Sequence, residues 1–204
     1  AQYDLDGLGF SGGAELSTVA GTIGATATWL WNRHDTLTDN SVVANAYEGA
    51  LYWRGNWGAL SGFARGSYSI VDFDGGRYFN AMSGEEAVTR TIDGEWSGNA
   101  TSFIAGASIE IGSQFFFFRP SVTLDYIRLS EDGYAETGGG DALDLTVEDR
   151  TSDELAVNLG SAVGFDLLGM RRGDKNWLRV EAEGGWREIL SGELGATRAR
   201  FGEG

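Results

Sequence analysis

Residues 22–32 read TIGATATWLWN, and this stretch decides the fold class of the chain. Its odd positions are apolar: Ile23, Ala25, Ala27, Trp29 and Trp31. Its even positions, Leu30 apart, hold threonine, glycine or asparagine. Side chains that alternate with a period of two lie on opposite faces of a β-strand. Glycine recurs in this and other apolar runs, and each glycine costs a helix about 1 kcal/mol. The stretch therefore predicts a strand with one apolar and one polar face.

The same alternation recurs along the chain, so about eight strands of roughly ten residues or more are expected. The other stretches are residues 8–16, 46–53, 60–70, 102–111, 116–126, 155–165 and 178–187. Short connections are expected near Ser17 and at residues 54–58, 112–114 and 169–176. Long polar loops are expected at residues 34–41, 71–95 and 130–141. Short turns at one end and long loops at the other are typical of outer-membrane barrels. The predicted fold class is an all-β, antiparallel, up-and-down transmembrane β-barrel.

Composition limits the classes of function. The chain has 15 basic and 30 acidic residues and a net charge of −15, which argues against a nucleic-acid partner. It has no cysteine, so neither disulfides nor thiolate metal sites are expected. No run of about 18 apolar residues is present, so no transmembrane helix is predicted. The first residues lack the basic and apolar regions of a signal peptide, which indicates that one was removed or that the chain is a fragment.

A soluble antiparallel sandwich would show the same alternation, with its apolar face inward. Two features favour a barrel in lipid instead. The polar face is rich in glycine, serine, threonine and alanine, which suits a lumen where side chains converge. Large aromatic residues collect near the ends of the apolar stripes, where a bilayer interface would hold them. These predicted interface residues are Trp29, Trp31, Trp53, Tyr68, Phe116, Phe118, Tyr126 and Trp186. The sandwich, using its long loops to bind a ligand, stays as the alternative.

The few charges on the polar face give the best functional hypothesis. They are Glu15, Glu48, Arg65, Glu110, Asp125, Arg179, Glu181, Glu183 and Arg187. In a water-filled barrel such residues influence what passes and hold a plug by hydrogen bonds. The alternative is that they pair across strands and only stabilise the wall.

Motifs for catalysis and metal binding are weak. Residues 9–13 match the G-x-S-x-G nucleophile elbow, but no helix follows, and the single histidine, His34, lies in a predicted loop. Residues 4–7 and 72–75 read D-x-D-G but lack the further ligands of a calcium loop. Loose calcium binding by Asp132, Glu136 and Asp141 is the strongest metal hypothesis. We predict no catalytic residue, cofactor or metal site, and therefore no enzyme.

Several segments carry a resemblance to a known family. Residues 118–128 read FRPSVTLDYIR and lead into a D-G-Y-x-E-x-G loop at residues 132–138. An A-L-x-L-x-V strand follows at residues 142–147, then T-S-D-x-L at 151–155. Residues 184–188, which read GGWRE, are similar to a G-W-R-x-E segment. Together these segments resemble the translocator β-domain of autotransporters, the type V secretion proteins of Gram-negative bacteria. The similarity is densest over roughly residues 100–190.

The resemblance implies a twelve-stranded barrel in the outer membrane of a Gram-negative bacterium, with a pore that exports a passenger domain. It further implies a helix through the pore. The implied partners are the passenger, outer-membrane lipid, the barrel-assembly machinery and periplasmic chaperones. Against that pattern, residues 1–204 are expected to be a single barrel domain, incomplete at both ends and covering approximately the second to ninth strands. Its two unpaired edges would not be tolerated in lipid. The alternative is a complete small barrel of eight strands with an adhesive or structural role.

Overall fold

The computed structural model describes residues 3–36, 40–83, 86–113, 115–140, 142–167 and 178–201. Every regular element in these ranges is a β-strand. The strands are β1 (Tyr3–Thr18), β2 (Gly21–Thr36), β3 (Ser41–Trp57), β4 (Leu60–Ser83), β5 (Glu86–Ile109), β6 (Ile111–Gly112), β7 (Phe116–Glu131), β8 (Tyr134–Ala135), β9 (Leu145–Val147), β10 (Arg150–Leu167), β11 (Leu178–Glu193) and β12 (Ala199–Phe201). No helix in the described ranges is long and apolar enough to cross a bilayer.

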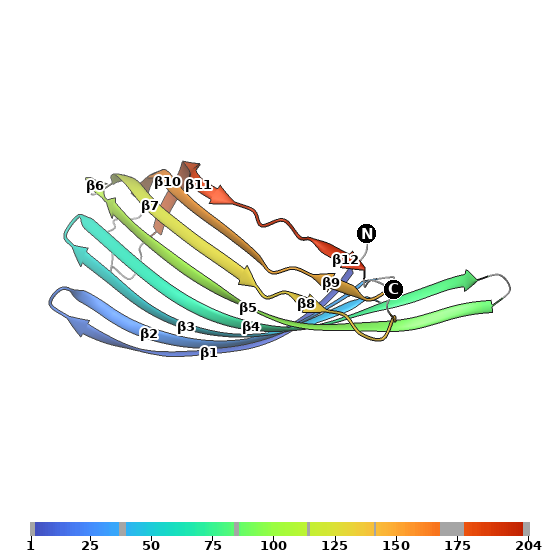
Figure 1. Ribbon diagram of the computed structural model, residues 1–204. Helices are drawn as coiled ribbons and strands as arrows, with labels where there is room; N and C mark the ends of the chain where they lie inside the picture. The colour runs from blue at the N-terminus through green and yellow to red at the C-terminus, as the bar shows by residue number, and fades with distance from the viewer. Residues whose placement is uncertain are drawn as a thin grey trace.

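The long strands form one antiparallel sheet in the order β1-β2-β3-β4-β5-β7-β10-β11, with short β6 paired to β7 (Figure 1). Each long strand therefore pairs with its neighbour along the chain, as an up-and-down topology requires. The expected all-β, antiparallel fold class is confirmed. Within the described residues β1 and β11 each have one partner, so these eight strands do not close into a small barrel by themselves. Short β8, β9 and β12 form a second, three-stranded sheet.

Two-residue turns connect the strands at one end of the sheet. Thr18 pairs with Gly21, and Trp57 pairs with Leu60, so each connection has two residues. Gly58 has a φ of 63°, in the left-handed region that tight hairpin turns need and that glycine adopts without strain. The predicted turns lie close to these positions, although β3 continues to Trp57 through the stretch read as a connection. The connection predicted at residues 169–176 lies outside the described residues.

The prediction of a long polar loop at residues 71–95 is wrong. These residues extend β4 and β5, which run for 24 residues each and form a hairpin that projects beyond the rest of the sheet (Figure 1). Their register is unbroken from Leu60↔Ile109 to Ser83↔Glu86. The loop at 130–141 also departs from expectation, since it contains β8 and continues β7 to Glu131. Many of the polar residues that suggested a loop occupy one face of a continuing strand.

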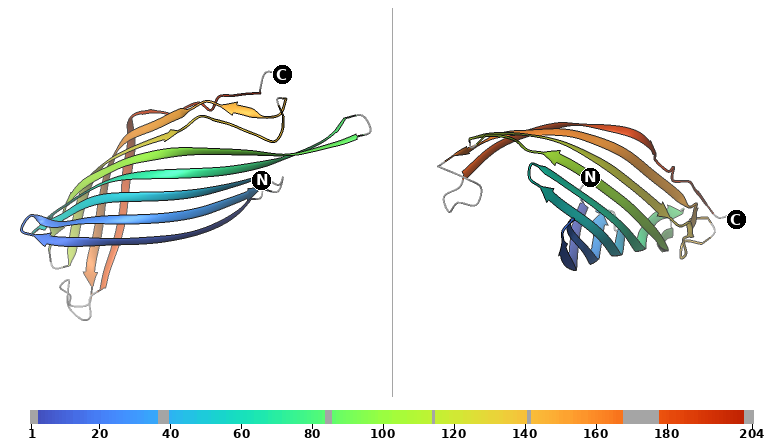
Figure 2. Two further views of the ribbon diagram at one scale, coloured as in Figure 1. Left: turned by 60° about the horizontal axis from the view of Figure 1, so that its bottom comes forward. Right: turned by 90° about the vertical axis from the view of Figure 1, so that its left-hand side faces the viewer.

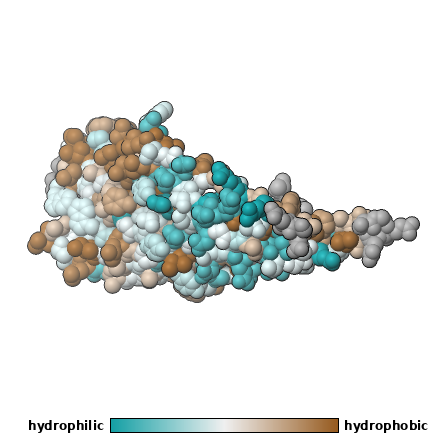
Figure 3. Space-filling model, in the orientation of Figure 1, coloured by the Kyte–Doolittle hydropathy of each residue, from teal (hydrophilic) through white to brown (hydrophobic). Residues whose placement is uncertain are grey.

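The sheet is strongly curved, like a trough (Figure 2). Its apolar face is exposed, with Phe10 at 66% and Leu51 at 68% of full exposure. Hydrophobic residues gather over the short-turn end of the strands, and hydrophilic residues lie over the middle and toward the long-loop end (Figure 3). Within the described residues no second sheet covers the apolar face. A soluble sandwich would bury this face, so the structure does not support that alternative.

The polar face is the concave one. The buried small residues of the trough lie on it: Ala50, Ser67, Ala156 and Ala162. The space around the glycines also differs between the two faces. A Cβ added at Gly24 or Gly164 would lie within 2.5 Å of neighbouring atoms, whereas one added at Gly12 or Gly49 would have no neighbour within 4 Å. Side chains therefore converge on the polar face and diverge on the apolar face.

Candidate functional site: the charged inner wall

The nine charges predicted to face a lumen lie together on the concave face, here called the inner wall. The cross-strand register runs from Glu15 through Gly24 and Tyr52 to Arg65. It continues through Ile104 to Asp125. Strand β11 brings three more charges to this face, where Glu181, Glu183 and Arg187 are in register with Gly164, Ala162 and Asn158 of β10. Glu110 and Arg179 reach the same wall and contact each other, with Arg179 Nη1 3.0 Å from Glu110 Oε2.

At the β1 side of the trough, charges pair across intervening strands. Arg54 Nη2 donates to both carboxylate oxygens of Glu15, each at 3.0 Å. The Tyr52 hydroxyl also donates to Glu15, at 2.8 Å. The Tyr52 ring lies over Gly24, where an added Cβ would be 2.2 Å from the ring. A glycine on β2 thus makes room for a β3 side chain to reach β1, and Arg65 and Glu48 form a further ion pair beside it.

A denser cluster lies toward the short-turn end of β7 and β11. Arg179 of β11 reaches across β10 and β7 to Glu110, and its guanidinium carbon is 3.9 Å from the centre of the Phe117 ring. Arg119 pairs with both Glu110 and Glu181, and lies 5.6 Å from the same ring. Phe117 is 2% exposed and covers Gly164. Two cations near one aromatic ring, with Glu110 shared between them, tie neighbouring strands together without covalent links.

A third cluster follows the same plan nearer the long-loop end. Arg187 on β11 donates to Asp125 Oδ2 at 2.9 Å, across β10, and also pairs with Glu154. Asn158 lies between them, accepts from Arg187 at 3.2 Å and donates to Asp125. Each cluster therefore spans at least three neighbouring strands, which a concave wall allows because its side chains converge.

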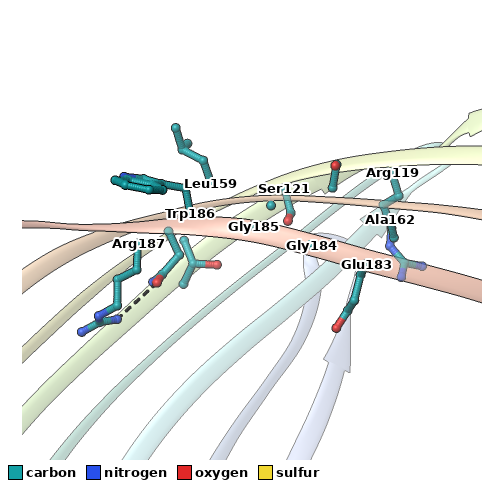
Figure 4. Close-up of a pocket in the computed structure, with 13 residues that line it drawn as sticks. Arg119, Ser121, Leu159, Ala162, Glu183, Gly184, Gly185, Trp186 and Arg187 are labelled. Atoms are coloured by element: carbon teal, nitrogen blue, oxygen red, sulfur yellow. Dashed lines mark hydrogen bonds between the residues drawn. The ribbon is translucent and has the colours of Figure 1, made fainter.

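A groove of about 420 Å³ separates the second and third clusters, with Gly160, Gly185 and Ser121 among its lining residues. In the close-up, Arg119, Glu183 and Arg187 point to one side of β11, while Leu159 and Trp186 point to the other (Figure 4). Glu183 is exposed and has no ion pair or hydrogen-bond partner among the described residues. Each of the other eight predicted charges is paired, as expected if these residues stabilise the wall. The hypothesis that they influence what passes and hold a plug stays a prediction.

Several inner-wall residues were missed by the sequence analysis. They are Tyr52, Arg54, Phe117, Arg119, Glu154 and Asn158. The sequence did contain a signal for Arg119, Phe117 and Asn158, because each occupies a polar-face position in the alternation of its predicted strand. Arg54 was assigned to a connection and Glu154 preceded the predicted strand at 155–165, since both predicted strands were too short.

The predicted interface aromatics all lie on the strands, and several are fixed by neighbours. Trp29 stacks on Phe10 with ring centres 5.9 Å apart, and Phe116 contacts Phe165 at 5.6 Å. Trp53 contacts Trp57 and donates from Nε1 to the Ala20 carbonyl at 2.9 Å, which ties two turns together. The other predicted aromatics lie on the same apolar face of the sheet: Trp31, Tyr68, Phe118, Tyr126 and Trp186. Their position at a bilayer interface remains a prediction.

The weak catalytic and metal motifs have structural roles. Ser11 of the G-x-S-x-G match lies within β1 and exchanges a hydrogen bond with Thr28 at 2.9 Å, so it is not at a nucleophile elbow. Asp132 accepts from Ser97 at 2.8 Å, and Glu136 is held by Arg77, so neither offers a free ligand set for calcium. Asp141 lies outside the described residues. No group of three or more His, Cys, Asp or Glu that could hold a metal occurs in the described ranges.

The D-G-Y-x-E-x-G loop docks on the inner face of the β4–β5 hairpin. Tyr134 stacks on Trp96, with ring centres 4.6 Å apart, and Trp96 stacks on Phe73 at 5.0 Å. Burial, reinforced by the carboxylate of Glu136, raises the pKa of the Tyr134 hydroxyl above its usual value. Gly138 has a φ of 104° and approaches the Thr91 carbonyl so closely that an added Cβ would be 2.4 Å away. Residues of the loop motif therefore hold the loop against the β4–β5 hairpin.

Comparison with known proteins agrees with this arrangement. Residues 1–204 match the model of the autotransporter beta-domain family. Two curated relatives, both called esterase EstA, come from Pseudomonas aeruginosa and Pseudomonas putida. Each is 29% identical to this chain over 130 residues, which is 62% of this chain and 19% of the relative. The chain thus spans about a fifth of the length of these relatives.

A solved structure shares the fold. The translocator domain of autotransporter NalP from Neisseria meningitidis superposes with a TM-score of 0.63, over 95% of this chain and 64% of that domain, at 16% sequence identity. The fold agrees with that of an outer-membrane translocator barrel, and the family model matches every residue of the sequence. We conclude that this chain belongs to the autotransporter β-domain family.

Proposed function

We propose that the domain is the wall of a pore through which a passenger polypeptide crosses the outer membrane of a Gram-negative bacterium. The single observation that carries this proposal is the contrast between the two faces of one curved sheet. The convex face exposes apolar side chains, which suits a surrounding of lipid, and the concave face holds paired charges and small polar residues. The family of the chain supports the same role. The wall acts as a conduit and performs no chemistry on the passenger.

The strand edges bear on how the pore closes. β1 and β11 each carry backbone groups that no described strand pairs, and unpaired edges are not tolerated in lipid. We propose that residues 1–204 form one barrel domain whose two edges pair with further strands of the same protein. The barrel-assembly machinery and periplasmic chaperones would be its partners during insertion, and the passenger its partner during export.

Site-specific crosslinking tests the conduit. The sequence contains no cysteine, so a single introduced thiol is unique within the domain. Ser121 lies on the inner wall, and the next residue, Val122, lies on the apolar face. In the full-length protein, Ser121→Cys should form a disulfide with a cysteine placed in a passenger that is arrested during export. The matched variant Val122→Cys should not. Equal crosslinking at both positions, or none at Ser121 while export proceeds, would contradict passage along this wall.

A further inference from the structure

Beyond Ile70 of β4, the polar and apolar faces of the sheet change places. Along β4 the inner face changes from Ser67 and Ser69 to Val71 and Phe73, while the outer face changes from Tyr68 and Ile70 to Asp72 and Asp74. The neighbouring strand β5 follows, with Trp96 and Ile92 inside and Glu95 and Asp93 outside. The inner face of the β4–β5 hairpin is therefore mainly apolar from Val71 to Phe73 and at Ile92 and Trp96, and apolar surface of this kind needs a cover in water.

A segment of the chain itself provides part of that cover. We call residues 132–140 and 142–149 the lid. Ile92 of β5 is only 1% exposed, and an added Cβ at Gly139 of the lid would lie 2.8 Å from it. Tyr134 of the lid continues the aromatic stack formed by Trp96 and Phe73. The lid thus seats its own apolar surface against the inner face of the β4–β5 hairpin.

One charged pair fastens the lid to the hairpin. Arg77 of β4 donates to Glu136 in a bidentate manner, from Nε to Oε1 at 2.9 Å and from Nη2 to Oε2 at 2.6 Å, and also to the Leu143 carbonyl. Glu136 Oε2 in turn accepts from the Leu145 amide at 2.9 Å. The Glu136 side chain is 9% exposed, so its charge depends on Arg77 as a partner. Asp93 and Thr137 add two backbone hydrogen bonds of 2.8 Å.

These attachments are few compared with those of the wall. The lid strands β8 and β9 have two and three residues, whereas β4 and β5 pair over 24 residues. Regions with short pairing and a small apolar contact open at lower free energy than long strands do. On its other side β9 pairs with β12, and Arg150 reaches Thr197, so the lid would stay tethered there if the Arg77 contact broke.

We propose that the lid is a removable cover at the outer mouth of the pore, held shut by the Arg77–Glu136 pair and the Ile92 contact. This inference rests on the proposed pore function and concerns its regulation. In the shut state the lid narrows the mouth against leakage. During export it lifts from the hairpin, and the apolar inner face it leaves becomes available to the emerging polypeptide.

Ion conductance of the complete barrel in a planar bilayer tests the lid without any passenger. Arg77→Gln and Glu136→Gln should each raise the fraction of time spent in the high-conductance state at least tenfold. The exchanged pair, Arg77→Glu with Glu136→Arg, should bring that fraction back toward the parent value. Arg90→Gln is the control on the hairpin, because among the described residues the Arg90 side chain donates only to the carbonyl of its neighbour Thr89. Glu148→Gln is the control within the lid, because among the described residues only the backbone amide of Glu148 has a hydrogen-bond partner, the Arg198 carbonyl.

A disulfide lock makes the test reversible. Asp93 and Thr137 exchange both backbone hydrogen bonds, and such pairs have Cα atoms about 5.5 Å apart, within the range that a disulfide spans. Asp93→Cys with Thr137→Cys should hold the barrel in the low-conductance state under oxidising conditions and release it with a reductant. Heat-modifiable gel mobility checks that each variant is folded.

The outcomes separate the two proposals. If the parent conducts ions and every folded variant of the Arg77–Glu136 pair and of the Asp93–Thr137 disulfide conducts as it does, the lid proposal is wrong and the pore proposal stands. If the parent and all variants, including the unlatched ones, conduct no ions, the pore proposal fails and the lid fails with it. Both proposals are supported if conductance rises when the Arg77–Glu136 pair is broken and falls when the Asp93–Thr137 disulfide forms.

Discussion

The lower and upper halves of β4 share one backbone and one register but have opposite faces. From Leu60 to Ile70 the apolar side chains except Phe63 lie on the convex face, and the residues between them are mostly small and polar. From Val71 to Phe79 the apolar side chains except Tyr78 lie on the concave face, where Phe73 and Ile92 of β5 are covered by neighbours. The pairing with β5 has no bulge across the change. The exchange is therefore made by the sequence alone, without a slip of the strand.

This contrast teaches where each solvent lies. A side chain is apolar on the face that meets lipid or protein and polar on the face that meets water. In the proposed pore, the lower half has lipid outside and water inside. In the upper half the outside is wet and the inside is covered by the lid. A transmembrane strand needs about 9–11 residues when tilted, so the 24 residues of β4 leave more than half of the strand outside the bilayer.

The largest effect is expected from a charge on the lower outer face. Val122→Arg places a guanidinium in the lipid-facing belt, at a cost of about 2–4 kcal/mol near the bilayer midplane. We expect the protein to lose heat-modifiable mobility and to appear in the outer membrane in much smaller amounts. Thr123→Arg, one residue away on the inner wall, and Glu95→Arg, on the upper outer face, should both assemble. Failure of all three variants alike would remove the distinction between the faces.

The next largest effect is expected in the upper half. Ile92→Ala removes a side chain that is 1% exposed, and truncations of this kind cost about 2–5 kcal/mol. Because Ile92 contacts the lid and not the belt, we expect this loss to appear as faster protease cleavage within residues 132–149. The heat at which the barrel itself unfolds on gels should stay close to the parent value. A barrel that unfolds more easily while lid cleavage is unchanged would place Ile92 in the main fold.

The alternation that predicted the strands is a local property of the sequence, and this explains its success. Each side chain shows its face by comparison with its neighbours two residues away, so TIGATATWLWN identified β2 without knowledge of its partners. The same rule placed the nine inner-wall charges on one face. It failed beyond Ile70, because Asp72 and Asp74 looked like loop residues when the strand was assumed to keep its apolar face outward.

The ion pairs of the lid and of the inner wall could not be predicted from neighbouring residues in the sequence. Arg77 and Glu136 are 59 residues apart, and Arg179 and Glu110 are 69 apart. Pairings over such separations depend on the register of several strands and on the curvature of the sheet. The D-G-Y-x-E-x-G motif carried a family resemblance, but the roles of Tyr134 and Glu136 required the position of the β4–β5 hairpin, which was predicted to be a loop.

A smaller effect is expected from the charge clusters of the lower inner wall. The Arg179 side chain is 10% exposed and contacts both Glu110 and the Phe117 ring. Arg179→Gln leaves part of the Glu110 charge uncompensated, so we expect a loss of about 1–3 kcal/mol in the free energy of unfolding. Urea titration of the barrel in lipid vesicles, followed by tryptophan fluorescence, measures it. Glu183→Gln is the control because Glu183 has no partner among the described residues, and the proposal of a structural cluster fails if both variants behave alike.

The smallest effect is expected at the exposed pair of the same wall. Arg54 and Glu15 have side chains that are 58% and 47% exposed, and ion pairs in contact with water contribute about 0.2–1 kcal/mol. The Tyr52 hydroxyl still donates to Glu15 when Arg54 is lost, which reduces the effect further. We therefore expect Arg54→Gln to shift the urea midpoint no more than Arg33→Gln, which breaks an exposed pair with Asp35 in the upper half. A loss at Arg54 as large as that at Arg179 would mean that the lower inner wall excludes water, because only a poorly hydrated site gives such a pair that much weight. The contrast between a wet lower interior and a covered upper interior would then have to be reversed.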